Sequence, residues 1–248
     1  MKLPKRELPV YSTDLKASGL KNIQYRPHTV KEEQILNMAS LSDSDKDKLA
    51  AVKQIVENCV DYDVSTLFPA EIEYLFMKIK ACSDSPKVPV IYTIVPEIDP
   101  KTGKNKHANC GETIETTFDI DKDIVVEETG DMDKYATRAK DGSWLVDIGQ
   151  SMQLQIRVKP LNAEVSESSI YELTESVIDE ANDSIVYKGD DFNEEEFLEW
   201  IGSIDSSAFS KFKEFMNSTP SCVANLTFKC KCGEVYKEKE YGVLRFLV

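Results

Sequence analysis

The amino-acid sequence predicts an α+β protein, because two kinds of hydrophobic spacing alternate along its 248 residues. Apolar residues recur at helical intervals from Val30 to about Ser83, and again in the last third of the chain. Between these parts, apolar and polar residues alternate with the period of two that is typical of strands. The composition, with 41% hydrophobic and 30% charged residues, is typical of a folded protein with a core.

The N-terminal part predicts a β-hairpin. Extended segments at Leu8–Leu15 and Leu20–Arg26 flank Gly19, which can adopt the positive φ that a tight turn needs. Pro27 then ends the second extended segment.

A helix is expected directly after this hairpin, from Val30 to about Leu41. Thr29 can cap it, and Glu32 stands at the position that completes a capping box. The apolar face expected for this helix consists of Ile35, Leu36, Met38 and Ala39. Two more helices follow, one over Asp45–Val60 and one that starts with Pro69 in its first turn.

The middle of the chain predicts strands at Val88–Val95, Thr113–Ile120, Asp123–Glu128, Trp144–Ile148 and Met152–Val158. The last third predicts a helix over Ser169–Asp183, a short extended segment at Ile185–Tyr187, and helices over Glu194–Ile204 and Ser206–Met216. Asn193 is the expected cap of the first of these last two helices. A final hairpin of Leu226–Cys230 and Glu234–Lys239 precedes an apolar tail, Val243–Val248.

We expect a single body that spans residues 1–248. Its parts are a hairpin with helices (1–84), a β-rich part (85–165), and an acidic helical part that ends in a hairpin (166–248). The sequence contains no internal repeat, no coiled-coil heptads and no flexible linker. We therefore predict that the three parts pack together compactly.

The net charge of −14 is concentrated in one segment, because residues 164–205 carry fourteen acids and the single base Lys188. The segment is either a solvated acidic surface or a surface that docks on a basic partner. Both interpretations argue against nucleic-acid binding, which needs Lys and Arg at phosphates. No apolar run is long enough to span a bilayer and no export signal is recognisable, so we expect a soluble intracellular chain with free thiols.

No catalytic site is predicted. Nucleophilic catalysis needs a Ser or Cys beside a base, and the only histidines are His28 and His107. We expect His28 to be partly buried and His107 to be solvated in a polar loop. Phosphate-binding and dinucleotide-binding glycine patterns are absent from the sequence, so no cofactor site is expected either.

The C-terminal cysteines leave one question open, which is whether the chain binds a metal. Cys222, Cys230 and Cys232 are the candidate ligands, and His107 with Cys110 could complete a four-ligand zinc site, because thiolate and imidazole suit this ion. The spacing Cys-x-Cys is less usual than Cys-x2-Cys, and the two groups lie far apart in the sequence. Free thiols in a hairpin are therefore the alternative to zinc.

Several segments together resemble a known family. The segments are Tyr25-Arg26-Pro27 with Val30–Glu33, Lys53–Cys59, Glu71–Phe76, Phe192–Ile201 and the terminal Cys-x-Cys-Gly hairpin. In this order and spacing they resemble the baseplate proteins of T4-like contractile-tailed bacteriophages, namely the small hub subunit and hub assembly proteins. The chain departs from that family's pattern at His28, where an aromatic residue is usual, and in the basic insertion Lys101–Lys106. It departs also at Cys230-Lys231-Cys232, because the family's terminal cysteine hairpin often looks more like a zinc knuckle.

The resemblance implies a non-enzymatic protein that builds the central baseplate hub or helps to build it. Its partners would be other phage baseplate hub proteins, and its location would be the host cytoplasm during assembly or the virion tail baseplate. We expect the contact surface on Ser169–Asp183, Asn193–Ile204 and the tail. A zinc-stabilised intracellular adaptor unrelated to phage is the alternative. The sequence does not separate a retained subunit from a transient chaperone.

Overall fold

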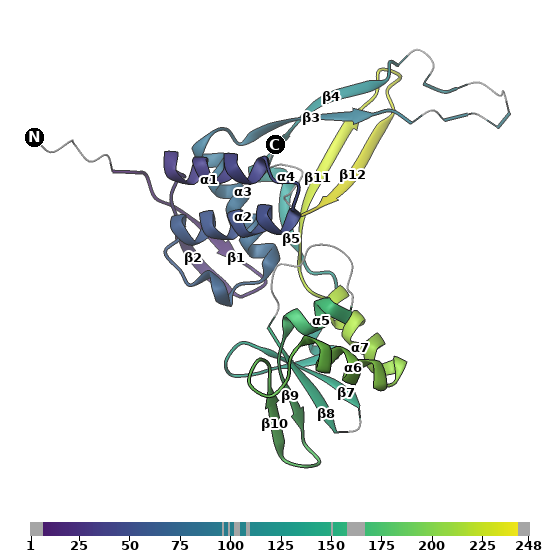
Figure 1. Cartoon of the computed structure of the whole chain (residues 1–248). Helices are drawn as coiled ribbons and strands as arrows, with labels where there is room; N and C mark the ends of the chain where they lie inside the picture. The colour runs from purple at the N-terminus through teal and green to yellow at the C-terminus, as the bar shows by residue number, and fades with distance from the viewer. Residues whose placement is uncertain are drawn as a thin grey trace, which may run out of the picture. The chain divides into compact units, whose positions relative to one another are not determined.

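The structure is a computed structural model that describes residues 7–95, 97–98, 100–101, 105–107, 110–149, 151–157 and 167–242. It confirms the predicted α+β class, with helices and several small antiparallel sheets (Figure 1). The chain divides into two compact units. Unit 1 comprises the described parts of Met1–Val64, Glu71–Val126 and Cys222–Val248, and unit 2 comprises Ser65–Ala70 and Glu127–Ser221.

Unit 1 begins with the predicted hairpin, formed by β1 (Tyr11–Leu15) and β2 (Leu20–Tyr25). Three helices follow: α1 (Val30–Ser40), α2 (Asp45–Cys59) and α3 (Pro69–Ser83). A short 3-10 turn, η1 (Val64–Thr66), lies between the last two in sequence, and most of it belongs to unit 2 with the first two residues of α3. The positions of the helices confirm the predictions for all three. Glu71 of α3 is fully buried and accepts hydrogen bonds from the backbone N–H (2.9 Å) and the hydroxyl of Ser18, so α3 holds the hairpin turn.

The predicted capping box of α1 is present. The side chain of Thr29 accepts from the first turn of the helix, and Glu32 accepts from the backbone N–H of Thr29 (2.7 Å). The apolar face of this helix differs from the prediction, since Met38 is 74% exposed whereas Ala39 is buried. Met38 lies about 100° around the helix from Ala39 and therefore outside the stripe that faces the core.

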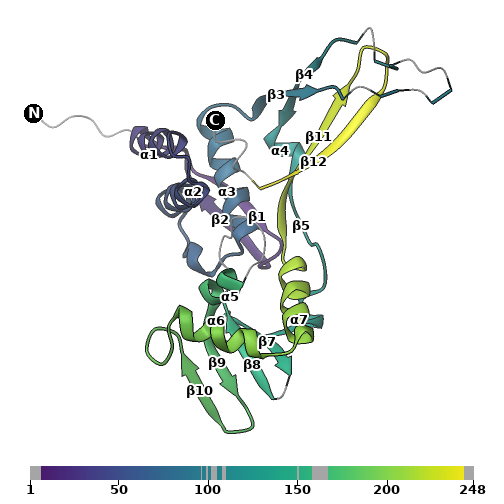
Figure 2. The same cartoon turned by 45° about the vertical axis from the view of Figure 1, so that its right-hand side comes forward.

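The rest of unit 1 consists of two β-ribbons and a connecting helix. Strands β3 (Lys87–Thr93) and β4 (Thr113–Asp119) pair as one ribbon, and α4 (Ile120–Asp123) leads from β4 into β5 (Ile124–Glu127). Strand β11 (Ser221–Lys229) pairs with β12 (Val235–Tyr241) as the predicted final hairpin, and β11 also pairs with β5. The ribbons β3–β4 and β11–β12 lie side by side in both views (Figures 1 and 2).

Unit 2 contains a five-stranded antiparallel sheet in the order β10-β9-β8-β7-β6. Its strands are β6 (Ala136–Arg138), β7 (Trp144–Gly149), β8 (Met152–Ile156), β9 (Thr174–Asp179) and β10 (Ser184–Tyr187), preceded by the 3-10 turn η2 (Met132–Lys134). The helices are α5 (Glu167–Leu173), α6 (Glu194–Ser203) and α7 (Ser206–Asn217). Asn193 and Glu196 form a capping box at α6, which confirms the predicted cap.

The helix predicted over Ser169–Asp183 is wrong beyond Leu173, because the chain continues from α5 into strand β9. Thr174 and Ser176 are fully buried and alternate with partly exposed neighbours, and Val177 and Ile178 add the β-branched side chains that strands favour. The apolar residues of this segment fit the spacing of a helix and that of a strand, and the segment forms a strand because it pairs with β8 and β10. The contact surface expected on this helix is therefore not a helical face.

Aromatic and aliphatic side chains fill the core of unit 2. Phe212 and Phe215 of α7, together with Phe197 of α6, are almost completely buried. The tail Val243–Val248 lies outside the described residues. Among the residues that the structure describes, we find no helix with the length and hydropathy needed to cross a membrane.

Candidate metal centre

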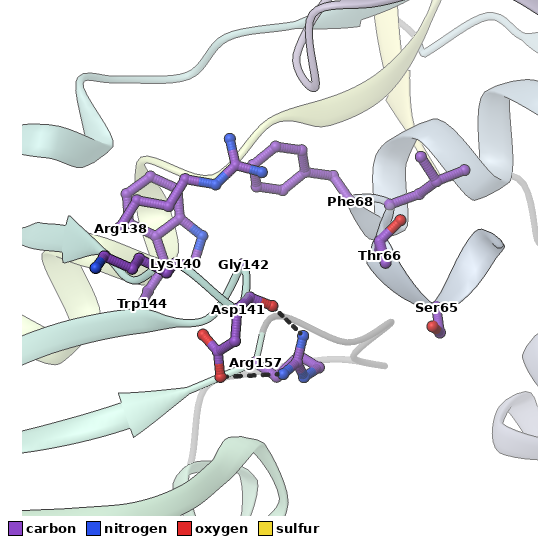
Figure 3. Close-up of a pocket in the computed structure, with 10 residues that line it drawn as sticks. Ser65, Thr66, Phe68, Arg138, Lys140, Asp141, Gly142, Trp144 and Arg157 are labelled. Carbon is purple, nitrogen blue, oxygen red and sulfur yellow. Dashed lines mark hydrogen bonds and ion pairs between the residues drawn. The ribbon is translucent and has the colours of Figure 1, made fainter.

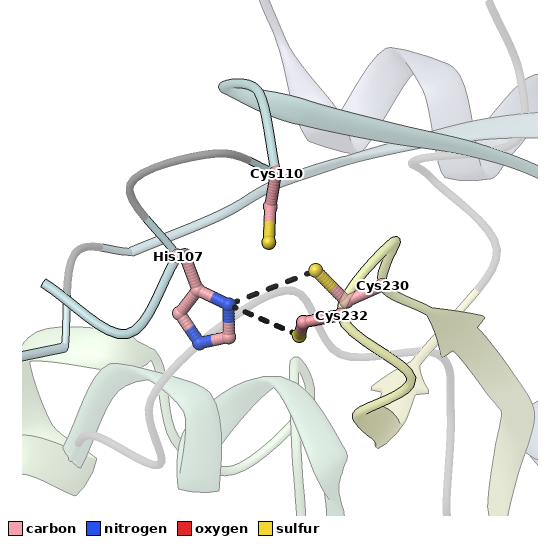
Figure 4. A group of neighbouring side chains, drawn as sticks. All are labelled: His107, Cys110, Cys230 and Cys232. Atoms are coloured by element: carbon pink, nitrogen blue, oxygen red, sulfur yellow. Dashed lines mark hydrogen bonds between the residues drawn. The ribbon is translucent and has the colours of Figure 1, made fainter.

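Four potential metal ligands from two distant parts of the sequence meet in unit 1. The ligand atoms of His107, Cys110, Cys230 and Cys232 all lie within 4.8 Å of one another. The Nδ1 atom of His107 is 3.6 Å from the sulfur of Cys230 and 3.7 Å from that of Cys232 (Figure 4). Figure 4 shows the sulfur of Cys110 pointing toward the same space from the opposite side.

The first pair of ligands lies in the segment between β3 and β4. The backbone N–H of Cys110 donates to the carbonyl of His107 (2.9 Å), which folds these two residues into a tight turn. Gly111 follows with φ +89°, a conformation that strongly favours glycine. The turn therefore directs the imidazole and the thiol to one side.

The second pair lies at the tip of the β11–β12 ribbon. The N–H of Cys230 donates to the carbonyl of Glu234 (2.8 Å), and the N–H of Gly233 donates back to the carbonyl of Cys230 (2.9 Å). Gly233 has φ +96°, so a glycine is favoured directly after Cys232. This tight tip places the sulfurs of Cys230 and Cys232 on the side that faces the first turn.

Aromatic packing holds the two ribbons together beside the four ligands. The ring of Tyr92 on β3 lies 4.6 Å from the ring of Phe228 and 5.4 Å from that of Tyr236, measured between centroids. Ile94, Cys110 and Cys230 are buried together in the same cluster. The ligand group is therefore built on packed strands and does not depend on the ligands alone.

The imidazole of His107 is oriented by partners on its other nitrogen. Its Nε2 atom lies 2.7 Å from the hydroxyl of Tyr236 and 3.3 Å from a carboxylate oxygen of Glu234. A carboxylate at this distance favours the proton on Nε2. The Nδ1 lone pair then faces the sulfurs, as in metal sites where a second layer of residues fixes the histidine.

The three thiols interact strongly when they carry protons. A hydrogen bond from the backbone N–H of Cys232 lowers the pKa of Cys230, and the thiol of Cys110 adds a second hydrogen bond to the same sulfur. The pKa of Cys110 is raised to about 11, first by this bond to Cys230 and then by burial. A proton is therefore more readily lost from Cys230 than from Cys110.

The structure brings together two of the three cysteines proposed as ligands, Cys230 and Cys232. Cys222 lies outside the group, at the other end of β11, where burial raises the pKa of its thiol. His107 is 3% exposed, so the expectation that it is solvated is wrong: the rings and turns around it exclude water. His28 is partly buried, as expected, and its backbone N–H donates to the Ser83 hydroxyl.

Sequence reasoning missed Tyr236 and Glu234 as partners of His107. The one available signal is their position in the sequence, because Glu234 directly follows the Cys-x-Cys-Gly turn and Tyr236 lies in the strand after it, β12. A lone tyrosine in an alternating strand is normally interpreted as a packing residue.

A cavity of about 240 Å³ lies in unit 2 (Figure 3), and further hollows of about 330 and 90 Å³ lie in unit 1. Two of the three cationic side chains that line the cavity in unit 2, Arg138 and Arg157, have partners. Arg157 contacts Glu175 (2.7 Å) and Asp141 (3.6 Å), and the guanidinium of Arg138 lies over the ring of Trp144. These pairs stabilise the end of the sheet, and we assign no ligand to the cavity.

A family model described as "T4 bacteriophage base plate protein" matches residues 8–247 of the chain. The chain belongs to this family. No curated protein and no solved structure gives a significant match.

The match covers both units of this baseplate protein and both turns of the candidate metal centre. It confirms the predicted T4-like baseplate family. It also argues against the alternative of an adaptor unrelated to phage, and membership in a structural family favours a non-enzymatic role.

Proposed function

We propose that this protein is a structural or assembly subunit of the central hub of a contractile phage tail baseplate, and that it acts through contacts with other hub proteins. The observation that carries the proposal is the baseplate family match over residues 8–247. During assembly the protein would reside in the host cytoplasm, and a retained subunit would then be part of the virion tail baseplate.

An exposed sheet edge in unit 2 supports a role in protein–protein contacts. Strand β10 is the last strand of the five-stranded sheet, and its side chains Ile185 and Tyr187 are 49% and 50% exposed. Edge strands with apolar side chains are sites where another protein can add a strand.

Acidic residues follow this edge strand directly. Asp190 and Asp191 lie between β10 and α6, and the first turn of α6 carries Glu194, Glu195 and Glu196. The proposed partner surface is therefore basic and contributes an extended segment, because charge complementarity steers association and sets its orientation.

Mass spectrometry of purified tails, together with a pull-down of the tagged protein from infected cells, tests the proposal. Recovery in mature baseplates supports a retained hub subunit. Recovery with hub precursors but not with finished tails supports an assembly chaperone. Recovery with neither contradicts the hub function.

A pair of matched variants tests the contact surface. The test variant, Ile185→Lys with Tyr187→Lys, places two positive charges on the edge strand β10. The control variant, Val235→Lys, places a positive charge on β12, at a side chain that is 50% exposed. We expect the β10 variant to reduce recovery of hub proteins by about tenfold, which corresponds to about 1.4 kcal/mol of binding free energy. Equal recovery with both variants would exclude β10 as the contact.

A further inference from the structure

We propose that His107, Cys110, Cys230 and Cys232 bind one Zn²⁺ ion in a closed tetrahedral site that fastens the β3–β4 ribbon to the β11–β12 ribbon. This proposal does not rest on the hub function. It assigns a structural metal, because four protein ligands leave no open position for a substrate or a reactive water.

The distances between the ligand atoms fit a tetrahedral zinc ion. Zn–S bonds of about 2.3 Å and Zn–N bonds of about 2.0–2.1 Å require N···S separations of about 3.6 Å and S···S separations of about 3.8 Å. The two measured separations from Nδ1 of His107 to sulfur are 3.6 and 3.7 Å. The remaining pairs of ligand atoms all lie within 4.8 Å of each other, so a movement of about 1 Å or less brings them to the separations that zinc requires.

The ligand types favour zinc over the hard cations. Three soft thiolates and one imidazole suit Zn²⁺, whereas Mg²⁺ and Ca²⁺ prefer oxygen. Three thiolates and a divalent ion leave one negative charge on the site. The ammonium of Lys231, which lies between the two ligand cysteines in sequence, reaches to about 4.0 Å from the Cβ position of Gly111, beside Cys110.

The surroundings of His107 match those of a metal-bound histidine. Nδ1 faces the three sulfurs, and Nε2 faces the hydroxyl of Tyr236 and the carboxylate of Glu234. Such partners hold a ligand histidine in one tautomer and one orientation. A histidine used only for packing does not need three sulfurs on one side and a carboxylate on the other.

A second arrangement of ligands competes with this one. Glu97, His107 and Glu234 also lie close together, and a metal there would bind the Nε2 atom of His107. That position already has the hydroxyl of Tyr236 at 2.7 Å, and both carboxylates are exposed. The sulfur-rich side is therefore the better site for a soft ion.

The first test uses the full-length wild-type chain, purified under reducing conditions and stripped with a chelator. We expect it to take up one Zn²⁺ per chain. With Co²⁺ as a probe, we expect the visible bands of a tetrahedral ion and strong thiolate charge-transfer absorption. A folded, reduced chain that takes up no metal, or that gives an octahedral spectrum without thiolate absorption, would overturn the proposal.

Variants then identify the ligands. Cys110→Ser and Cys232→Ser should each lower metal affinity at least tenfold and weaken the thiolate absorption. Cys82→Ser is the matched control, because a serine there can keep the hydrogen bond to the carbonyl of Ile79 (3.2 Å). Equal metal uptake by the ligand variants and this control would refute the site.

Two further variants separate the competing ligand sets. Cys222→Ser should keep the ion, and loss of the ion from a folded Cys222→Ser chain would contradict the four-ligand set. Glu97→Gln should also keep it with an unchanged Co²⁺ spectrum. Loss of the ion from this variant would instead support the carboxylate site at Nε2. Because these assays use the isolated chain, their outcome is independent of the tail experiments that test the hub function.

Discussion

Substitution of Glu32 by Gln should weaken the junction between the hairpin and the first two helices of unit 1. Glu32 is 5% exposed and accepts a hydrogen bond from the guanidinium of Arg26 (3.1 Å) and another from the backbone N–H of Thr29 (2.7 Å). The same guanidinium donates to the carbonyl of Asn58 (2.8 Å) at the end of α2. The carboxylate therefore holds an arginine that joins α1 to α2.

The size of the effect follows from the pKa of Glu32. Burial alone would raise this pKa, but hydrogen bonds from Thr29 and Arg26 and the positive charge of Arg26 lower it from 4.5 to about 2. A shift of this size corresponds to about 3 kcal/mol of stability above pH 5. Because the native state binds fewer protons than the unfolded state, this stability is lost as the pH falls from about 5 through 2.

We expect Glu32→Gln to cost about 2–3 kcal/mol at pH 7, because the amide keeps the shape but loses the charge. The difference from the wild type should narrow by about 1 kcal/mol at pH 3.5. Glu33→Gln is the matched control, since Glu33 carries the same charge in the same helical turn but is exposed. It should cost no more than about 0.5 kcal/mol.

The assay must report on unit 1 alone. Both tryptophans, Trp144 and Trp200, lie in unit 2, so fluorescence is the wrong probe. Urea titration read by hydrogen exchange in peptides from residues 26–60 measures the junction, and peptides from 144–156 provide an internal reference. Equal effects of Glu32→Gln and Glu33→Gln, or a difference that does not change with pH, would refute the reasoning.

Three more outcomes are expected in unit 1. Glu71→Ala should lower the free energy of unfolding by about 2–4 kcal/mol, because it removes two hydrogen bonds to a buried carboxylate. Ser18→Ala should lower it by about half as much, because the hydrogen bond from the backbone N–H of Ser18 remains. Equal losses in urea titrations would contradict this. Burial raises the pKa of Glu73 to about 7, so the folded state binds this proton more tightly than the unfolded state. The free energy of unfolding should therefore fall by about 2–3 kcal/mol as the pH rises from 4.5 to 8. Glu73→Gln should abolish this fall, and an unchanged pH profile of stability in the variant would refute the role of Glu73. Zinc bound as proposed, with free zinc at 100 times its Kd, adds about 2.7 kcal/mol to the free energy of unfolding of unit 1. A chelator should therefore lower the urea concentration at which peptides near His107 lose their protection from hydrogen exchange, but not the value for peptides in unit 2.

Local signals in the sequence were sufficient for most of the fold. The capping boxes at Thr29 and Asn193 act within one helical turn, so the sequence alone predicts where α1 and α6 begin. The segment after Leu173 was mispredicted because its spacing fits a helix and a strand equally, and pairing with β8 decides the matter. Such pairing is a property of the tertiary structure.

The candidate site was predictable in its chemistry but not in its assembly. The ligand residue types and the hairpin tip at Cys230–Gly233 are visible in the sequence, whereas His107 was expected in a solvated loop. His107 and Cys230 are 123 positions apart, and the sequence between them carries no signal that the two turns meet. Nor does the sequence show that Tyr92 and Tyr236 stack beside them and bury His107, because aromatic residues in alternating strands pack in many ways.

The discontinuity of unit 1 has a consequence for its biosynthesis. Strand β5 ends at Glu127, but its neighbour β11 begins at Ser221, after nearly all of unit 2 has been made. At about 5–20 residues per second, the ribosome needs roughly 5–20 s to make this stretch. During that time neither edge of β5 is paired, and the cysteines of the last hairpin are not yet available to His107 and Cys110. The nascent chain is therefore most open to aggregation, and to capture by a chaperone, until its final strands emerge.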